Sequence, residues 1–220
     1  MFKAAIFDWD GVVVDSSAAH KASWELLAEQ RGLPLPDNHF ALGFGKKNQT
    51  IIPSIYKWSQ DPDEIEELGF AKEELYRRIL KESGLNPALP GAIDLFKELK
   101  SAGIPMAVGT STPRENVDLV IELIGAEGFF GAIISAEDVS HGKPDPEVFL
   151  KGAEALGVNP VDCAVFEDAI YGVEAALAGG MKAVCLTTTH PREYFDSVQP
   201  HAFVSNLAGV NLQFLQDLYS

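Results

Sequence analysis

The chain begins with a short apolar segment that ends in two carboxylates. Residues 4–7 read Ala-Ala-Ile-Phe, and Asp8, Trp9, Asp10 and Gly11 follow directly. Such a run predicts a strand buried on both faces of a parallel sheet, and these sheets bind ligands at the carboxyl ends of their strands. Asp8 and Asp10 point the same way in an extended segment, so their charges repel unless a cation such as Mg²⁺ neutralises them. Taken alone, the segment could equally be a solvated Asp-Gly turn.

The remaining sequence predicts an α/β core interrupted by a helical segment. From residue 16 to residue 86 the hydrophobic spacing is that of helices, with no convincing strand. From Pro87 onward helices alternate with strands, which are predicted at 104–110, 129–134, 163–166, 182–187 and 202–204. Repeated strand–helix units of this length predict a doubly wound parallel sheet. We therefore expect a core of residues 1–15 and 87–220, with an all-helical insertion over residues 16–86.

Local signals predict how three of the helices begin. Ser16 is expected to cap the first helix of the insertion, and Asp61 with Glu64 forms a capping box for a later one. Thr112 with Glu115 is expected to cap the helix after the second strand in the same way.

Composition and charge exclude several classes of protein. The chain has 220 residues, of which 46% are hydrophobic and 22% charged, as in ordinary globular proteins. A net charge of −15 without a basic stripe argues against binding to nucleic acid or to anionic membranes. Neither a membrane span nor a signal-peptide pattern is present, so we expect a cytoplasmic protein. Cys163 and Cys185 lie in apolar runs and are expected to be buried, reduced thiols.

Polar side chains also follow the later predicted strands. The second strand ends in Thr110, the third leads to Lys143, and the fourth ends in Glu167 and Asp168. Carboxylates can attack phosphorus, move protons and hold Mg²⁺, while a lysine and hydroxyl groups can stabilise charge on a phosphoryl group. Lys143 alone could be a solvated loop residue, and Glu167-Asp168 alone a helix cap. Together with the first turn, these groups indicate phosphoryl transfer.

The order of these motifs resembles that of the haloacid dehalogenase-like hydrolases. The residues that carry the resemblance, over the whole chain, are Asp8, Asp10, Gly11, Asp15, Thr110, Lys143, Glu167 and Asp168. The helical insertion looks like the small cap domain of that family. His20 and Trp24, after the first motif, look most like the group that contains β-phosphoglucomutase and many sugar-phosphate phosphatases.

The resemblance implies catalytic and metal-binding roles. Asp8 would be the nucleophile that forms an aspartyl-phosphate, and Asp10 the general acid and base, with its backbone carbonyl also binding Mg²⁺. Glu167 and Asp168 would hold the metal with Asp8, directly or through water. Dehalogenases of the family lack the second aspartate, so Asp10 argues against a haloacid substrate.

The resemblance also implies contacts to the substrate. Thr110 and Lys143 would contact the phosphoryl group, and Lys143 would screen the charge on Asp8. A second anionic group of the substrate could dock at the start of the helix that carries Arg114 and Asn116, although these two could equally be exposed without a function. The expected substrate contacts are His20, Lys46, Ser111, Thr112, Arg114 and Asn116. Trp24 could face the site or the core, and Asp15 could instead cap the first helix.

The sequence favours a phosphatase over a mutase. Leu42 stands where the mutase pattern has a lysine, and Lys46 replaces its arginine, which weakens the grip on a second phosphate. Residues 45–49 and 58–62 also resemble relatives that dephosphorylate flavin-pathway intermediates. We expect a Mg²⁺-dependent phosphatase of a small phosphorylated metabolite, monomeric or weakly dimeric, with a phosphomutase as the alternative. A non-catalytic binding module would have lost a catalytic carboxylate, and none is lost.

Overall fold

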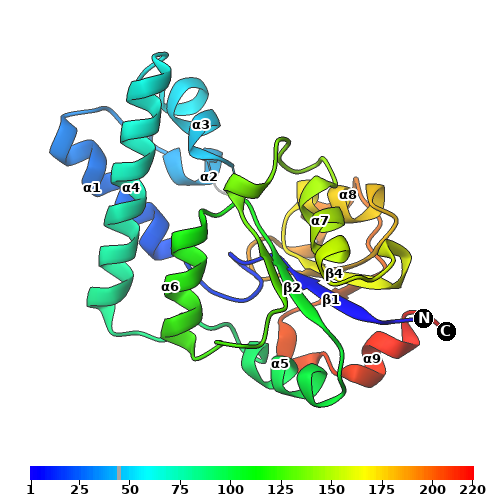
Figure 1. The fold of residues 1–220 in the computed structure, drawn as a ribbon. Helices are drawn as coiled ribbons and strands as arrows, with labels where there is room; N and C mark the ends of the chain where they lie inside the picture. Colours follow the sequence, from blue (N-terminus) through cyan, green and yellow to red (C-terminus); the bar gives the residue numbers. More distant parts are fainter. Residues whose placement is uncertain (44–45) are drawn as a thin grey trace. The chain divides into compact units, whose positions relative to one another are not determined.

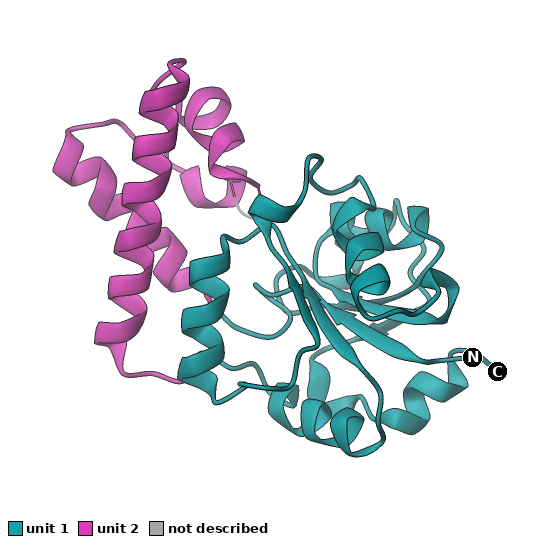
Figure 2. Cartoon of the chain, in the orientation of Figure 1, with its two compact units in different colours: residues 1–15, 87–220 teal, residues 16–86 magenta. Residues whose placement is uncertain are grey.

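The chain divides into two compact units, which are described separately here. The structure is a computed structural model that describes residues 1–43 and 46–220. Residues 1–15 and 87–220 form one unit, the core unit, and residues 16–86 form the other, the helical unit (Figure 2). Phe44 and Gly45 lie outside the described residues, and Gly45 is the first residue of the stretch 45–49 that was compared with flavin-pathway relatives.

The core unit is built on a six-stranded parallel sheet with the order β3-β2-β1-β4-β5-β6 (Figure 1). The doubly wound parallel sheet expected from the sequence is therefore confirmed. The inner strands β1, β2 and β4 are completely buried because they are apolar on both faces. The strands are β1 (Ala4–Phe7), β2 (Met106–Gly109), β3 (Ala132–Ile134), β4 (Cys163–Glu167), β5 (Lys182–Leu186) and β6 (Ala202–Val204).

Helices cover both faces of this sheet. In Figure 1, α7 and α8 lie on one face, and α5 and α6 on the other. The helices of the core unit are α5 (Ala92–Ser101), α6 (Arg114–Ile124), α7 (Glu147–Ala155), α8 (Ile170–Ala178) and α9 (Leu212–Asp217). The chain runs from β1 outward to β2 and β3, then crosses back to β4 on the other side of β1. The strand order therefore reverses between β1 and β4, which is where open α/β sheets bind their ligands.

Every regular element in the described part of the helical unit is helical, as the sequence predicts. These elements are α1 (Ser17–Arg31), α2 (His39–Gly43), α3 (Asn48–Thr50), a π-helical segment (Ile51–Tyr56) and α4 (Pro62–Ser83). Their apolar faces form a small core of their own, which includes Leu27, Ile52 and Leu75. Trp24 belongs to this core and is only 3% exposed, so packing accounts for its place on α1.

The predicted helix caps are only partly correct. The Asp61 carboxylate accepts the backbone N–H groups of Asp63 and Glu64, at 2.9 and 3.3 Å, and so caps α4 as predicted. Ser16 makes no side-chain capping bond to α1. Thr112 does not cap α6 either, since that helix starts after Pro113 and the Thr112 hydroxyl has another partner, described below.

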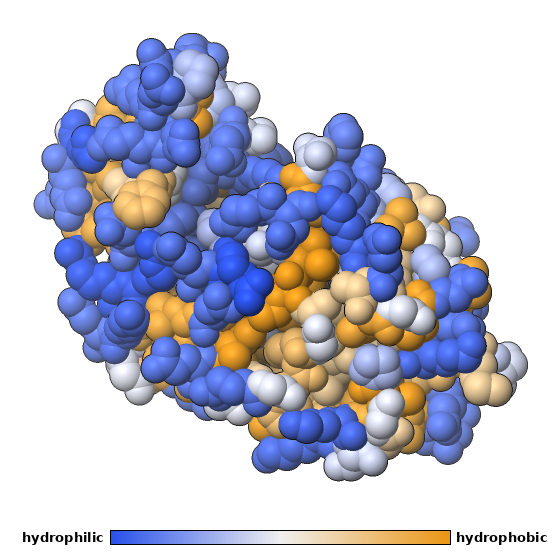
Figure 3. Space-filling model, in the orientation of Figure 1, coloured by the Kyte–Doolittle hydropathy of each residue, from blue (hydrophilic) through white to orange (hydrophobic). Residues whose placement is uncertain are grey.

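The cysteines are buried as the sequence predicts, and the described helices and one face of the surface can also be characterised. Across the described ranges, no helix has both the length and the apolar character needed to cross a membrane. In Figure 3, hydrophobic residues gather over the core unit between the positions of α6 and α7. Cys163 and Cys185 are free and buried, as expected, and burial raises the pKa of their thiols to about 11 and about 12.

Candidate active site

The pairing of β1 with β4 brings the first carboxylates together. Phe7 of β1 lies beside Phe166 of β4 in the sheet register, and their rings stack with centroids 4.7 Å apart. The backbone N–H of Asp8 donates to the carbonyl oxygen of Phe166 at 3.0 Å. Asp8, directly after β1, and Glu167, the last residue of β4, therefore lie at the carboxyl ends of neighbouring strands.

Asp8, Glu167 and Asp168 form a buried group that we call the carboxylate cluster. Each offers an oxygen, and these oxygens lie within 4.8 Å of one another. Burial raises the pKa of Asp8 to about 7, against the effect of Lys143, and burial together with Glu167 raises the pKa of Asp168 well above its usual range. A divalent cation would relieve this repulsion, and carboxylate oxygens are the ligands that Mg²⁺ prefers. The cluster therefore fits a hard divalent cation.

Lys143 reaches the carboxylate cluster from the loop between β3 and α7. Its Nζ lies 2.7 Å from Asp8 Oδ1 and 2.5 Å from Glu167 Oε1, and 4.8 Å from the ring centroid of Phe149. Burial lowers the pKa of Lys143, but the charges of Asp8 and Glu167 outweigh this and raise it above its usual value. The side chain is therefore a fixed ammonium next to Asp8.

Both oxygens of Glu167 have partners within the core unit. Oε1 contacts Lys143, and Oε2 accepts the backbone N–H groups of Asp168 and Ala169, each at 2.8 Å. Gly172 on α8 gives the carboxylate its room, because a Cβ atom there would lie 1.8 Å from Oε1. Glu167 is thus held between the start of α8 and the ammonium of Lys143.

Asp10 is held by the turn that follows β2. The hydroxyl of Thr112 donates to Asp10 Oδ2. The Oγ1 of Thr110, which is only 2% exposed, accepts the backbone N–H of Thr112 at 3.1 Å. Ser111 lies half-buried between them. The segment 110–112 therefore brings hydroxyl groups to the first turn, although Thr112 contacts a carboxylate and was predicted to contact substrate.

The start of α6 already holds a carboxylate of the protein. The backbone N–H of Arg114 donates to the two carboxylate oxygens of Glu137, at 3.1 and 3.3 Å. The side-chain Nε of Arg114 donates to Asp118 at 2.8 Å. Asn116 is fully buried and does not belong to the carboxylate cluster. An anionic group of a substrate would have to displace Glu137 to use this helix N-terminus.

His20 and Lys46, the other predicted substrate contacts, belong to the helical unit. The His20 ring stacks on Tyr76 with centroids 4.0 Å apart, and its Nδ1 lies 2.7 Å from the Nζ of Lys72. Lys72 is only 2% exposed and also contacts Glu73 at 2.9 Å. Since an ammonium only donates hydrogen bonds, the Nδ1 atom of His20 is the acceptor in this contact. Lys46 donates to the carbonyl of Leu42 at 2.9 Å.

Two further threonines at the core site were missed by the sequence reading. The hydroxyl of Thr188 donates to the carbonyl oxygen of Gly11, and the hydroxyl of Thr189 donates to Asp168 Oδ2. Both follow β5 directly. Ligand-binding groups tend to follow the strands of a parallel sheet, so the position of both threonines just after the fifth strand was the sequence signal for them.

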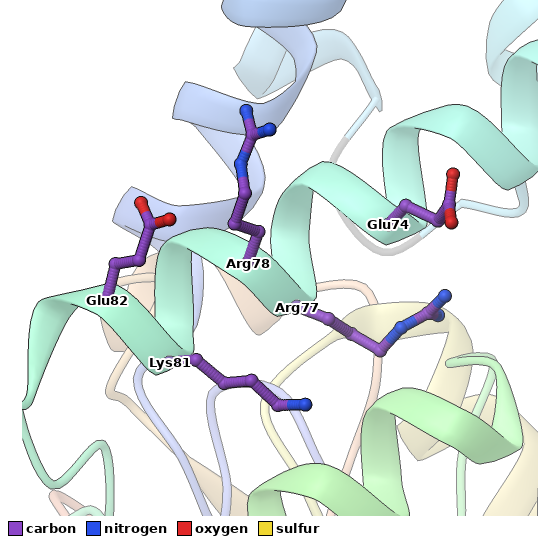
Figure 4. A pocket seen from close by; sticks show the side chains of 5 residues that line it. All are labelled: Glu74, Arg77, Arg78, Lys81 and Glu82. Atoms are coloured by element: carbon purple, nitrogen blue, oxygen red, sulfur yellow. The ribbon is translucent and has the colours of Figure 1, made fainter.

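Two surface hollows lie outside the carboxylate cluster. One, of about 350 Å³, runs along α4, where Figure 4 shows Arg77 and Lys81 extending to the same side of the helix. The other, of about 280 Å³, lies between α5 and residues 207–211. Neither contains a residue predicted to act in the chemistry.

A parallel sheet that gathers carboxylates and a lysine at one edge is typical of enzymes that hydrolyse phosphate esters. Residues 2–180 match the model of the haloacid dehalogenase-like hydrolases, and the chain belongs to this family. The resemblance stated from the motifs is confirmed.

Curated relatives include two phosphatases. A chloroplastic 5-amino-6-(5-phospho-D-ribitylamino)uracil phosphatase of Arabidopsis thaliana is 34% identical over 85% of this chain, which spans only 50% of that protein. A fructose-1-phosphate phosphatase of Escherichia coli is 33% identical over 83% of this chain and 95% of its own length.

Among solved structures, a β-phosphoglucomutase from Clostridium difficile has a TM-score of 0.87 and 26% identity. The match covers 100% of this chain and 97% of that one. The relatives therefore include both of the activities that the sequence left in competition.

Proposed function

We propose that this chain is a Mg²⁺-dependent phosphatase that hydrolyses a small phosphorylated metabolite, such as a sugar phosphate. The observation that carries the proposal is the position of Lys143, which bridges Asp8 and Glu167 beside Asp168. This arrangement supports the assignment of Asp8 as the nucleophile, Lys143 as the cation that faces it and Asp168 as a carboxylate that would bind the metal. The uracil-derivative phosphatase and the fructose-1-phosphate phosphatase described above support the same class of reaction.

The metal would be held by the side chains of the carboxylate cluster. Asp8 and Asp168 offer oxygens directly, and the backbone carbonyl of Asp10 is the further ligand that the family resemblance implies. Glu167 would reach the metal directly or through water, as the resemblance implies. Both of its oxygens already have partners within the protein. When bound, Mg²⁺ would neutralise charge on the phosphoryl oxygens.

The first chemical step joins Asp8 to the phosphoryl group. An Asp8 oxygen attacks phosphorus, and the bond from phosphorus to the ester oxygen breaks. The leaving oxygen takes its proton from Asp10, which acts as the general acid. Thr112 donates to Asp10 Oδ2 and so helps to orient the carboxyl group that carries the transferred proton.

The second step releases inorganic phosphate. A water molecule attacks the phosphorus of the aspartyl-phosphate while Asp10 accepts its proton, and the bond between Asp8 and phosphorus breaks. In both steps the ammonium of Lys143 and the hydroxyl of Thr110 stabilise charge on the transferring group. The enzyme returns to its starting protonation state.

A phosphomutase is the second candidate, because the β-phosphoglucomutase of known structure is so similar in fold. A mutase must hold a bisphosphate while the phosphoryl group is returned to the sugar. The carboxylate of Glu137 at the start of α6, and the pairing of Arg114 with Asp118, favour a substrate with one phosphate. We propose a monomeric enzyme whose partner is the metabolite alone.

Hydrolysis of p-nitrophenyl phosphate tests the proposal. The wild-type protein should release p-nitrophenol with Mg²⁺ and lose this activity in EDTA, and Asp8→Asn should abolish it because the nucleophile is removed. Asp196→Asn, a change at an exposed aspartate outside the cluster, is the matched control and should retain activity. Metal-dependent turnover that survives in Asp8→Asn, or no turnover in wild type, would contradict the proposal.

A second assay separates the two candidates. A mutase primed with the corresponding bisphosphate would interconvert β-glucose 1-phosphate and glucose 6-phosphate, whereas a phosphatase would release inorganic phosphate from one or both. A screen of phosphorylated metabolites would then identify the substrate.

A further inference from the structure

The loop after β5 contacts the active-site edge from a strand that the proposed mechanism does not use. We call residues 187–190 the threonine loop, because Thr187, Thr188 and Thr189 make up most of it. Thr188 donates its hydroxyl proton to the carbonyl oxygen of Gly11, and Thr189 donates to Asp168 Oδ2. The loop therefore joins the turn after β1 to the carboxylate that follows β4.

The threonine loop is anchored at both ends. The backbone N–H of Thr187 donates to the carbonyl oxygen of Val204 on β6 at 3.0 Å. At the other end, the His190 ring stacks on Tyr194 with centroids 3.9 Å apart, and Phe195, only 1% exposed, is buried in the core of the unit. With both ends fixed, the hydroxyl of Thr189 has a defined position against Asp168.

Gly11 closes the remaining space around the Asp168 carboxylate. Its φ of +80° is in the left-handed region that glycine favours. A Cβ atom at this position would lie 1.9 Å from Asp168 Oδ2 and 2.6 Å from Thr189 Oγ1. Gly11, Asp168 and Thr189 thus pack directly on one another. A residue larger than glycine at position 11 would not fit beside the contact between Asp168 Oδ2 and the Thr189 hydroxyl.

We propose that Thr189 is a positioning residue for Asp168. Its hydroxyl engages Asp168 Oδ2, so the other carboxylate oxygen of Asp168 would be the one offered to a divalent cation. Partners of this kind fix the orientation of a metal-binding carboxylate, and their loss weakens metal binding. The inference rests on the proposed function, because it assumes that the carboxylate cluster binds Mg²⁺.

The alternative is that Thr189 only fills space in the loop. Valine has nearly the same shape as threonine and lacks the hydroxyl, whereas serine keeps the hydroxyl and lacks the methyl group. A packing role predicts that Thr189→Val behaves as wild type and Thr189→Ser is impaired. A positioning role predicts the opposite order.

The experiment measures Mg²⁺ binding by calorimetry and melting temperature in EDTA, on the full chain. Thr189→Val should weaken Mg²⁺ binding by about tenfold or more, and Thr189→Ser should stay within about threefold of wild type. Thr187→Val is the matched control, since its loop contact is made by the backbone N–H, and it should bind Mg²⁺ normally. If Thr189→Val does not fold, Thr189→Ala is the second hydroxyl-free variant and should show the same loss.

The outcomes separate this inference from the proposed function. Wild type that binds Mg²⁺, with hydroxyl-free variants that bind it equally well, would overturn the role of Thr189 and leave the phosphatase proposal intact. Wild type that binds no Mg²⁺ would overturn both. A lower melting temperature in EDTA with unchanged Mg²⁺ affinity would assign Thr189 to packing alone, and also overturns the inference.

Discussion

The ammonium nitrogen of Lys143 lies 2.5 Å from Oε1 of Glu167, on the side chain whose other oxygen accepts two backbone N–H groups at the start of α8. Glu167 therefore links a helix terminus to the residue that faces Asp8. This relationship separates the role of Glu167 from that of Asp168, although both follow the same strand.

Replacing Glu167 should impair the reaction more than it impairs metal binding. Glu167→Gln removes the negative charge that holds Lys143 but keeps the shape of the side chain. We expect kcat to fall by about tenfold or more, with Mg²⁺ affinity changed much less than in Asp168→Asn. Steady-state kinetics and Mg²⁺ titration of both variants test this. Equal losses of Mg²⁺ affinity in the two variants would assign Glu167 to direct ligation instead.

Loss of the Thr112 hydroxyl should reduce proton transfer by Asp10. Thr112→Val leaves Asp10 without the donor on Oδ2, so its carboxyl group is no longer held for the leaving oxygen. We expect kcat to fall by about tenfold while Mg²⁺ affinity is retained, and Thr112→Ser to recover most of the rate. A change in KM alone would instead support the substrate contact that the sequence predicted for this residue.

Stability without metal should fall as the pH rises. Burial raises the pKa of Asp8 to about 7, against the effect of Lys143. Since the folded state binds this proton more tightly, the contribution is fully present below the ordinary pKa of an aspartate and is lost as the pH rises through about 7.

Melting temperatures in EDTA should therefore decrease between about pH 5 and about pH 8, and Mg²⁺ should stabilise the protein more at the higher pH, where its ligands are ionised. Asp8→Asn has no carboxyl proton at this position and should flatten the profile. A profile as steep in Asp8→Asn as in wild type would place the titrating group elsewhere.

Removing Glu137 should open the start of α6 to anions. Glu137→Ala frees the backbone N–H of Arg114, which then can bind a second phosphate, and removes a favourable charge from the helix N-terminus. We expect stronger inhibition by a sugar bisphosphate and a melting temperature lower by about 2–4 °C. Glu115→Ala is the matched control, because it removes another carboxylate from the first turn of α6 and leaves Glu137 on the backbone N–H of Arg114. Unchanged bisphosphate inhibition would show that this terminus lies away from the bound substrate.

Removing only one partner of the buried Lys72–Glu73 ion pair in the helical unit should destabilise the protein. Burial raises the pKa of Glu73, but the charge of Lys72 and the hydrogen bonds from Asn48 and Lys72 outweigh it and lower the pKa below its usual value. Lys72→Met leaves Glu73 buried beside an apolar residue, and we expect a loss of about 3 kcal/mol of stability. Adding Glu73→Gln to Lys72→Met should restore part of the loss. Additive losses in the double variant would contradict this coupling.

Much of the fold could be predicted because its signals are local and repeated. Every predicted strand is present, and the helical insertion is confirmed in its described part. Strands 104–110 and 129–134 were predicted too long, because apolar residues such as Ile104, Phe129 and Phe130 precede the paired residues of β2 and β3. The π-helical segment at Ile51–Tyr56 was missed, because over six residues its hydrophobic spacing does not differ from that of an α-helix.

Residues at the end of a single strand could be predicted from the sequence. Contacts between side chains of two different loops could not be predicted as well. Asp8, Lys143, Glu167 and Asp168 were proposed from strand ends, and the structure brings them together. Thr112 was assigned to a helix cap and to substrate because its partner, Asp10, lies 102 positions away in the chain. The pairing of His20 with Lys72 depends in the same way on how α1 and α4 pack.

The strand order has a consequence for how the protein can be made. β1 is synthesised before every other strand, yet one of its two neighbours is β4, and Lys143 follows Asp8 by 135 positions. A nascent chain that has emerged only as far as β3 carries Asp8 without the ammonium of Lys143 and leaves one edge of β1 unpaired. The ribosome must therefore release most of the chain before β1 gains its second neighbour, and any fragment that ends before β4 will have neither a complete sheet nor a complete carboxylate cluster.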